Sequence, residues 1–123
     1  MSERDVALAR NGLEAWRRGD LDTLEKMLAP EATWRWFEPG DWDCDNREEI
    51  LGTLRERYEQ GFGRGEIDLV DAGAGAVVAV SRPREVRGDE WPEETATVLA
   101  FREDKIVSMQ DYRTRDEAIA AVG

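Results

Sequence analysis

Histidine is absent from the 123 residues of the chain, and cysteine occurs only once, as Cys44. The lack of histidine excludes histidine-dependent nucleophilic triads, histidine general bases and histidine metal ligands together. A single cysteine cannot form an intramolecular disulfide, and it fits a reducing compartment. We therefore expect a fold that is stable without a disulfide.

Long apolar runs are also lacking. No stretch is long enough to span a bilayer, and the N-terminus shows no signal-peptide pattern. The 17 basic residues are outnumbered by 28 acidic ones, which gives a formal net charge of −11. A surface of this charge repels phosphate backbones, so nucleic acid is an unfavourable partner. We expect a soluble, cytoplasmic protein that binds neither nucleic acid nor membrane, and whose acidity serves solubility.

Three helices are predicted in the first half of a chain whose length suits a single domain, residues 1–123. The first is indicated by apolar residues at spacings of three and four, namely Val6, Ala9, Leu13 and Trp16. Asp20 is placed to cap the second helix, which Pro30 stops. The third helix is capped by Asp45 or Asn46 and ends at Gly61.

Strands are predicted by alternating or valine-rich segments over residues 31–38, 66–71, 76–82, 95–102 and 105–113. A short helix through residue 121 closes the chain. Three helices with one strand among them, followed by a run of strands, predict an α+β fold. We expect the helices to pack on one face of a strongly curved, mostly antiparallel sheet with a central cavity at its open end.

Three segments carry a resemblance to a known family: AWRRGDLDTLEKMLAPEATWRW, the helix start NREEI and the closing hairpin TVLAFREDKIVSMQDY. Together they resemble the SnoaL-like branch of the nuclear transport factor 2-like superfamily, over nearly the whole chain. The resemblance implies a cone of three helices on a bent sheet, commonly dimeric. Members include polyketide cyclases, ketosteroid isomerases, dehydratases, limonene-type epoxide hydrolases and non-catalytic binding domains, so the fold does not settle the function.

The resemblance points to Asp111 and Arg82 as catalytic candidates. Similar epoxide hydrolases and polyketide cyclases carry a catalytic aspartate on the last strand, and an arginine of the epoxide hydrolases corresponds to Arg82, which we expect to pair with Asp111. A carboxylate in an apolar cavity has a raised pKa, which suits acid/base work near neutral pH. Arg84 stands where those hydrolases have a second aspartate, and two tryptophans replace their tyrosine and asparagine, which argues against epoxide hydrolysis itself.

Tryptophan is abundant, with five copies. Two of them, Trp34 and Trp36, are two residues apart and share one face of a strand, where they either line a cavity or fill the core. Trp42 and Trp91 lie in polar loops and either close the cavity mouth or enter a dimer contact. The predicted ligand-binding residues are Trp16, Trp34, Trp36, Tyr58 and Met109.

The last strand predicts which face is inward. Val107, Met109 and Asp111 share a face by alternation, and two of these three are apolar, so this face is expected to point into the cavity. The opposite face is mixed in character and is expected to form a homodimer contact; it consists of Ile106, Ser108, Gln110 and Tyr112.

A metal site is not expected. Asp41, Asp43 and Asp45 alternate as in a calcium loop, but Asn46 and Gly52 stand where that loop needs its glycine and its bidentate glutamate. We expect no cofactor either.

Two functional hypotheses follow. In the first, a SnoaL-like domain binds a small, mostly apolar organic molecule, and Asp111 is the acid/base group of an isomerase-, cyclase- or hydrolase-type step. In the second, the domain is a non-catalytic module for ligand binding or dimerisation, and its tryptophans belong to the core.

Overall fold

The computed structural model describes residues 2–38, 40, 43–61, 65–73, 75–82 and 94–122. The elements, in chain order, are α1 (Ser2–Arg17), α2 (Leu21–Met27), β1 (Leu28–Arg35), α3 (Arg47–Gln60), β2 (Glu66–Gly73), β3 (Ala76–Arg82), β4 (Thr95–Arg102), β5 (Lys105–Tyr112) and α4 (Arg115–Val122). Asp41, Trp42, Arg84 and Trp91 lie outside the described residues.

The helix ends form where the local sequence signals predict them. Gly19 adopts a left-handed φ of 73° after α1, and Gly61 ends α3 with a φ of 97°. Asp20 accepts a hydrogen bond from a backbone N–H in the first turn of α2, and Asn46 does the same for α3. These caps satisfy donors that have no partner inside the helix. The turn from α1 into α2 is therefore encoded within a few residues.

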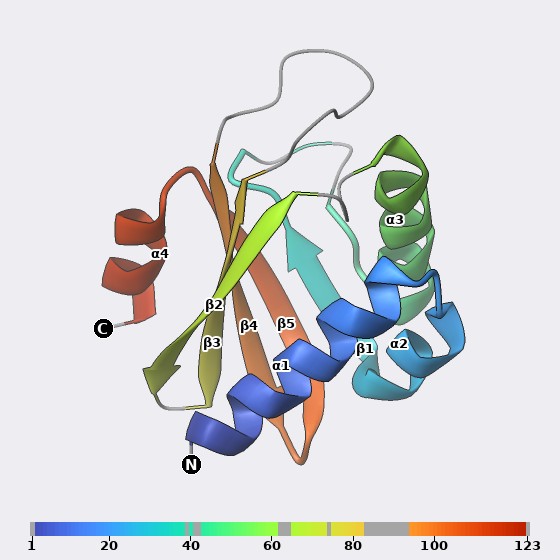
Figure 1. The fold of residues 1–123 in the computed structure, drawn as a ribbon, viewed down its shortest axis with the longest axis horizontal. Coiled ribbons are helices and arrows are strands. Elements are labelled where there is room, and N and C mark those ends of the chain that lie inside the picture. Colours follow the sequence, from blue (N-terminus) through green and yellow to red (C-terminus); the bar gives the residue numbers. More distant parts are fainter. Residues whose placement is uncertain are drawn as a thin grey trace.

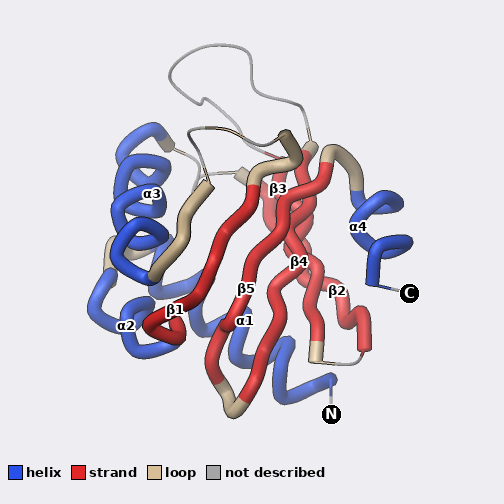
Figure 2. Tube along the Cα trace, turned by 180° about the vertical axis from the view of Figure 1, so that it is seen from behind, coloured by secondary structure: helices blue, strands red, loops and turns tan. Residues whose placement is uncertain are grey.

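The five strands form one sheet in the order β1-β5-β4-β3-β2. All neighbours are antiparallel except β1 and β5, which run parallel. Figure 1 shows α1, α2 and α3 together on one side of the curved sheet and α4 apart from them at the other side. Figure 2, seen from behind, shows the face of the sheet turned away from α1–α3. The architecture is the predicted α+β cone.

Strand β1 differs from its predicted position. It begins at Leu28, directly after α2, and ends at Arg35, so it lies three residues earlier than the predicted 31–38. Pro30 therefore falls inside the strand rather than before it. Because β1 is an edge strand, the missing N–H of this proline does not interrupt the sheet. The pairing with β5 shifts register between Leu28 and Thr33.

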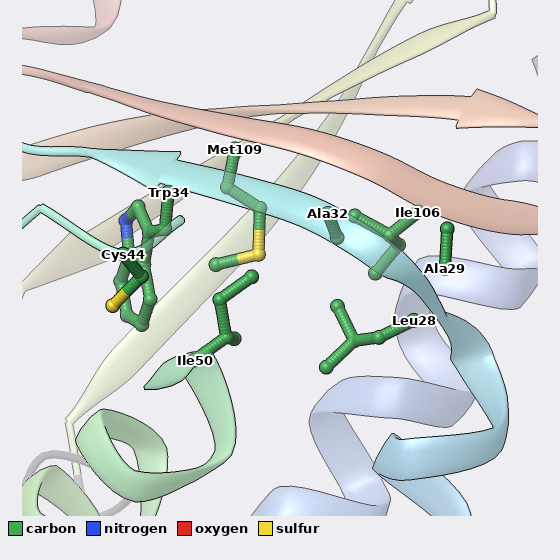
Figure 3. Packing of buried hydrophobic residues seen from close by; sticks show 8 residues of the cluster. All are labelled: Leu28, Ala29, Ala32, Trp34, Cys44, Ile50, Ile106 and Met109. Carbon is green, nitrogen blue, oxygen red and sulfur yellow. The ribbon is translucent and has the colours of Figure 1, made fainter. Parts of the chain in front are cut away.

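Two buried clusters hold the layers together. The larger lies between β1, β5 and the helices, and Figure 3 shows Trp34, Met109 and Ile50 converging within it. The smaller lies on the opposite face of the sheet, where Val78 and Val80 pack against Ala118 of α4. Among the described residues, no helix is long and apolar enough to cross a membrane.

Candidate functional site

A cavity of about 160 Å³ lies between the helical layer and the concave face of the sheet. The helices contribute mainly apolar side chains to its wall, among them Leu13, Trp16, Leu24, Met27 and Leu54. The strands contribute a second group, which includes Trp34, Trp36, Leu69, Leu99 and Met109. Such a wall suits an apolar ligand, because apolar surface gains free energy when it leaves water.

Asp111 lies beside this wall and is almost completely buried, with 2% of its surface exposed. Its Oδ1 accepts hydrogen bonds from Trp34 Nε1 at 3.0 Å and from Thr97 Oγ1 at 2.6 Å. Its Oδ2 is buried without a hydrogen-bond partner among the described residues. Trp34 and Thr97 are among the described residues that line the cavity, whereas Asp111 is not. The carboxyl group therefore fixes the side chains of Trp34 and Thr97 in the wall, although it is not itself part of the wall.

Burial raises the pKa of Asp111 above its ordinary value, because a charged carboxylate loses its hydration there. The positive charge of Arg57 and the hydrogen bonds from Thr97 and Trp34 oppose this shift, and burial outweighs each of them. Asp111 thus keeps its proton to a higher pH than an exposed aspartate.

Arg57 is the cation that the structure brings to this site. It lies on α3, and its guanidinium carbon is 4.4 Å from the ring centroid of Trp34 and 5.3 Å from that of Trp36. Burial lowers the pKa of Arg57, and the negative charge of Asp111 counteracts this. An arginine nevertheless stays protonated in proteins. Arg57 is the only charged residue among the described residues that line the cavity.

Arg82 does not pair with Asp111 as predicted. Its guanidinium forms ion pairs with Asp68 at 2.8 Å and with Glu94 at 3.2 Å. Its neighbour Ser81 lines the cavity, and successive strand residues point to opposite faces, so Arg82 points away from it. The resemblance to epoxide hydrolases pointed to Arg82, but the alternation of β3 turns this side chain away from Asp111. The positive charge near Asp111 comes instead from Arg57 of α3.

Tyr58 is likewise not in the cavity wall as the structure describes it. Its side chain is 41% exposed and packs near Gly19, at the corner between α1 and α2. One residue earlier, Arg57 lies on the same helical face as Ile50 and Leu54, at spacings of seven and three. The sequence does contain a signal for Arg57, because it is a charged residue on the otherwise apolar face of the helix. The predicted apolar stripe included Tyr58 and therefore missed it.

The other predicted ligand-binding residues meet at the cavity. Trp16, Trp34, Trp36 and Met109 all line it. Trp16 also donates a hydrogen bond from Nε1 to the carbonyl oxygen of Leu54 at 2.9 Å, which fixes its ring between α1 and α3. Trp34 in β1 and Trp36 just after the end of the strand thus both face the cavity, as their spacing of two predicts.

The inward face of β5 is only partly as predicted. Met109 and Asp111 are buried on it, but Ile106 takes the inner position near the strand start in place of Val107. Ile106 pairs with Phe101 while Ser108 pairs with the preceding residue of β4, so one residue of β5 is extra. Such a bulge reverses the alternation on one side of it. Ile106 therefore does not belong to the outward face proposed for dimerisation.

The aspartates that suggested a metal loop have other roles where they are described. Asp43 accepts a hydrogen bond from the backbone N–H of Trp36, and Asp45 forms an ion pair with Arg35. No group of three or more acidic or cysteine side chains within the described ranges is arranged to hold a metal ion.

The fold and cavity define a cone-shaped domain of the nuclear transport factor 2-like kind. A sequence model of the SnoaL-like domain matches residues 9–109, and the chain belongs to this family. No curated protein matches the chain in sequence.

Three solved structures illustrate the shared fold. Bal32a, from a soil-derived mobile gene cassette, is 20% identical with a TM-score of 0.72 over 90% of this chain and 89% of that one. A candidate SnoaL-like polyketide cyclase from Jannaschia sp. CCS1 is 14% identical with a TM-score of 0.69 over 99% and 92%. An NTF2-like protein from Burkholderia xenovorans LB400 is 16% identical with a TM-score of 0.64 over 100% and 98%. Identities this low establish a common fold and leave the chemistry to the site itself.

Proposed function

We propose that the domain binds a small, mostly apolar organic molecule in the cavity between α1–α3 and the sheet. The observation that carries this proposal is a cavity of about 160 Å³ with a mainly apolar wall. An engineered apolar cavity of about 150 Å³ stays dry and accepts benzene. A ligand with one six-membered ring, or an aliphatic part of similar volume, therefore fits without rearrangement of the wall.

Calorimetric titration with benzyl alcohol tests the proposal. Ala79 of β3 lines the cavity, so Ala79→Leu fills part of its volume and should abolish binding. Ala100 lies one strand away and, by alternation from Leu99, on the opposite face, so Ala100→Leu is the matched control and should bind as the unmodified protein does. Equal binding by both variants, or no binding by the unmodified chain, would contradict the proposal.

Acid/base catalysis of an isomerase, cyclase or hydrolase type is the second candidate function. The supporting observation is Asp111: a buried carboxyl group with a raised pKa and one oxygen without a hydrogen-bond partner among the described residues. Its neutral form can give a proton and its ionised form can accept one. Thr97 lines the cavity and bonds to Asp111, which gives the carboxyl group a hydroxyl contact with the cavity.

A simple proton-transfer reaction tests this candidate without knowledge of the natural substrate. Cyclohexanone exchanges the hydrogens beside its carbonyl for deuterium in D₂O when a base removes and an acid returns a proton, and NMR follows the exchange. The unmodified protein should accelerate the exchange over buffer, and Asp111→Asn should not. If neither does so while benzyl alcohol still binds, the non-catalytic binding module is the better description.

A further inference from the structure

Arg57 is an unusual residue for the wall of an apolar cavity. Leucine or methionine at this position would pack against Leu54, Trp34 and Trp36 without removing a charge from water. Removing a guanidinium from water has a substantial free-energy cost, which the negative charge of Asp111 and the two indole rings offset only in part. Packing alone therefore does not explain why the one charged wall residue in the described part of the chain is an arginine.

Two aromatic neighbours hold the guanidinium of Arg57 at the cavity wall. Trp34 and Trp36 both line the cavity, and both rings lie within cation–π distance of the guanidinium carbon. The indole of Trp34 is itself fixed by its hydrogen bond to Asp111. A guanidinium stacked on an aromatic face directs its N–H groups sideways, in its own plane, toward acceptors beside the ring. The planar fork of N–H groups on a guanidinium suits a planar, two-oxygen acceptor such as a carboxylate.

The rest of the cavity defines the remainder of such a ligand. Leu13, Leu24 and Met27 of the helical side face the sheet across a space that holds about one ring. The chain as a whole carries a net charge of −11, which repels anions at a distance. Recognition of an anion therefore depends on a cation inside the cavity, where low dielectric strengthens the interaction.

We propose that the cavity selects small monocarboxylates with an apolar part of about one ring, and that Arg57 binds the carboxylate. This inference rests on the proposed function, since it names the class of molecule that the same cavity takes. Arg57 is the group that discriminates the anion from a neutral molecule of equal shape.

Calorimetric titration with sodium benzoate and with benzyl alcohol, which share one ring and differ in charge, tests the inference. The unmodified protein should bind benzoate about tenfold or more tightly than benzyl alcohol, because charge-assisted hydrogen bonds outweigh neutral ones. Arg57→Met should remove this preference and leave benzyl alcohol binding in place. Arg55→Met changes the net charge equally on an exposed part of the same helix and should keep the preference.

Each outcome separates this inference from the function on which it rests. Equal affinity for both probes, unchanged in Arg57→Met, would overturn the role of Arg57 while the binding function stands. Failure of the unmodified chain to bind either probe would overturn both. If Arg57→Met binds neither probe, Arg57→Lys, which keeps the charge, is measured as well. A benzoate preference in Arg57→Lys supports the inference, and the absence of that preference contradicts the inference.

Discussion

Substitution of Asp111 shows how much the buried carboxyl group contributes to the cavity wall. Asp111→Ala leaves the indole N–H of Trp34 and the hydroxyl of Thr97 without their acceptor. A buried polar group left without a partner costs about 1–3 kcal/mol, so the buried indole N–H of Trp34 predicts a loss of about that size in the free energy of unfolding, and the half-buried hydroxyl of Thr97 adds less. A loss of this size is a large part of the stability of a small domain.

Asp111→Asn keeps an oxygen that accepts both hydrogen bonds, and its NH₂ group replaces an Oδ2 that has no partner among the described residues. At a pH where Asp111 carries its proton, this variant should therefore lie within about 1 kcal/mol of the unmodified protein. Urea unfolding followed by tryptophan fluorescence measures both variants. Equal losses for Asp111→Ala and Asp111→Asn would contradict a stabilising role of the hydrogen bonds from Trp34 and Thr97.

Three further expectations follow from the same structure. Burial raises the pKa of Asp111, so its stabilising contribution is complete below its ordinary pKa and is lost as the pH rises through the folded-state pKa. Asp111→Asn does not titrate, so it should gain stability relative to the unmodified chain on the alkaline side. Urea titrations at several pH values measure this difference. Light scattering at micromolar concentration should give a dimer mass, since the outward face of β5 with Gln110 and Tyr112 is half-buried and mixed in character; a monomer mass would reject this contact. Melting curves should not move with EDTA or a reductant, because Cys44 forms no disulfide and the apolar clusters supply the core; a drop of several degrees with EDTA would point to a metal site after all.

Local signals predicted most of the fold. Helix ends depend on residues a few positions apart, so Asp20, Asn46 and the two cap glycines could be read directly from the sequence. The start of β1 at Leu28 could not, because the strand is defined by its parallel pairing with β5, about eighty residues later in the chain. A contact at that separation leaves no mark in the nearby sequence.

The site was predictable where strand alternation is regular. The spacing of Trp34 and Trp36 predicted that they share a face but not whether that face lines a cavity or fills the core, and the apolar partners of Asp111 on β5 indicated a buried carboxyl group. The bulge in β5 and the true neighbour of Asp111 were not predictable in this way. Arg57 reaches the site from α3, and only tertiary packing brings that helix against the tryptophans.

Crystals of the protein soaked with bromobenzene show whether the cavity holds a small organic molecule. The bromine atom gives an anomalous signal that locates the ring without reference to Arg57 or to any charge on the ligand. We expect a bromine position inside the cavity, between Trp34 and Met109 on one side and Leu24 on the other. Bromine positions confined to the outer surface, with the cavity unoccupied at saturating bromobenzene, would contradict it.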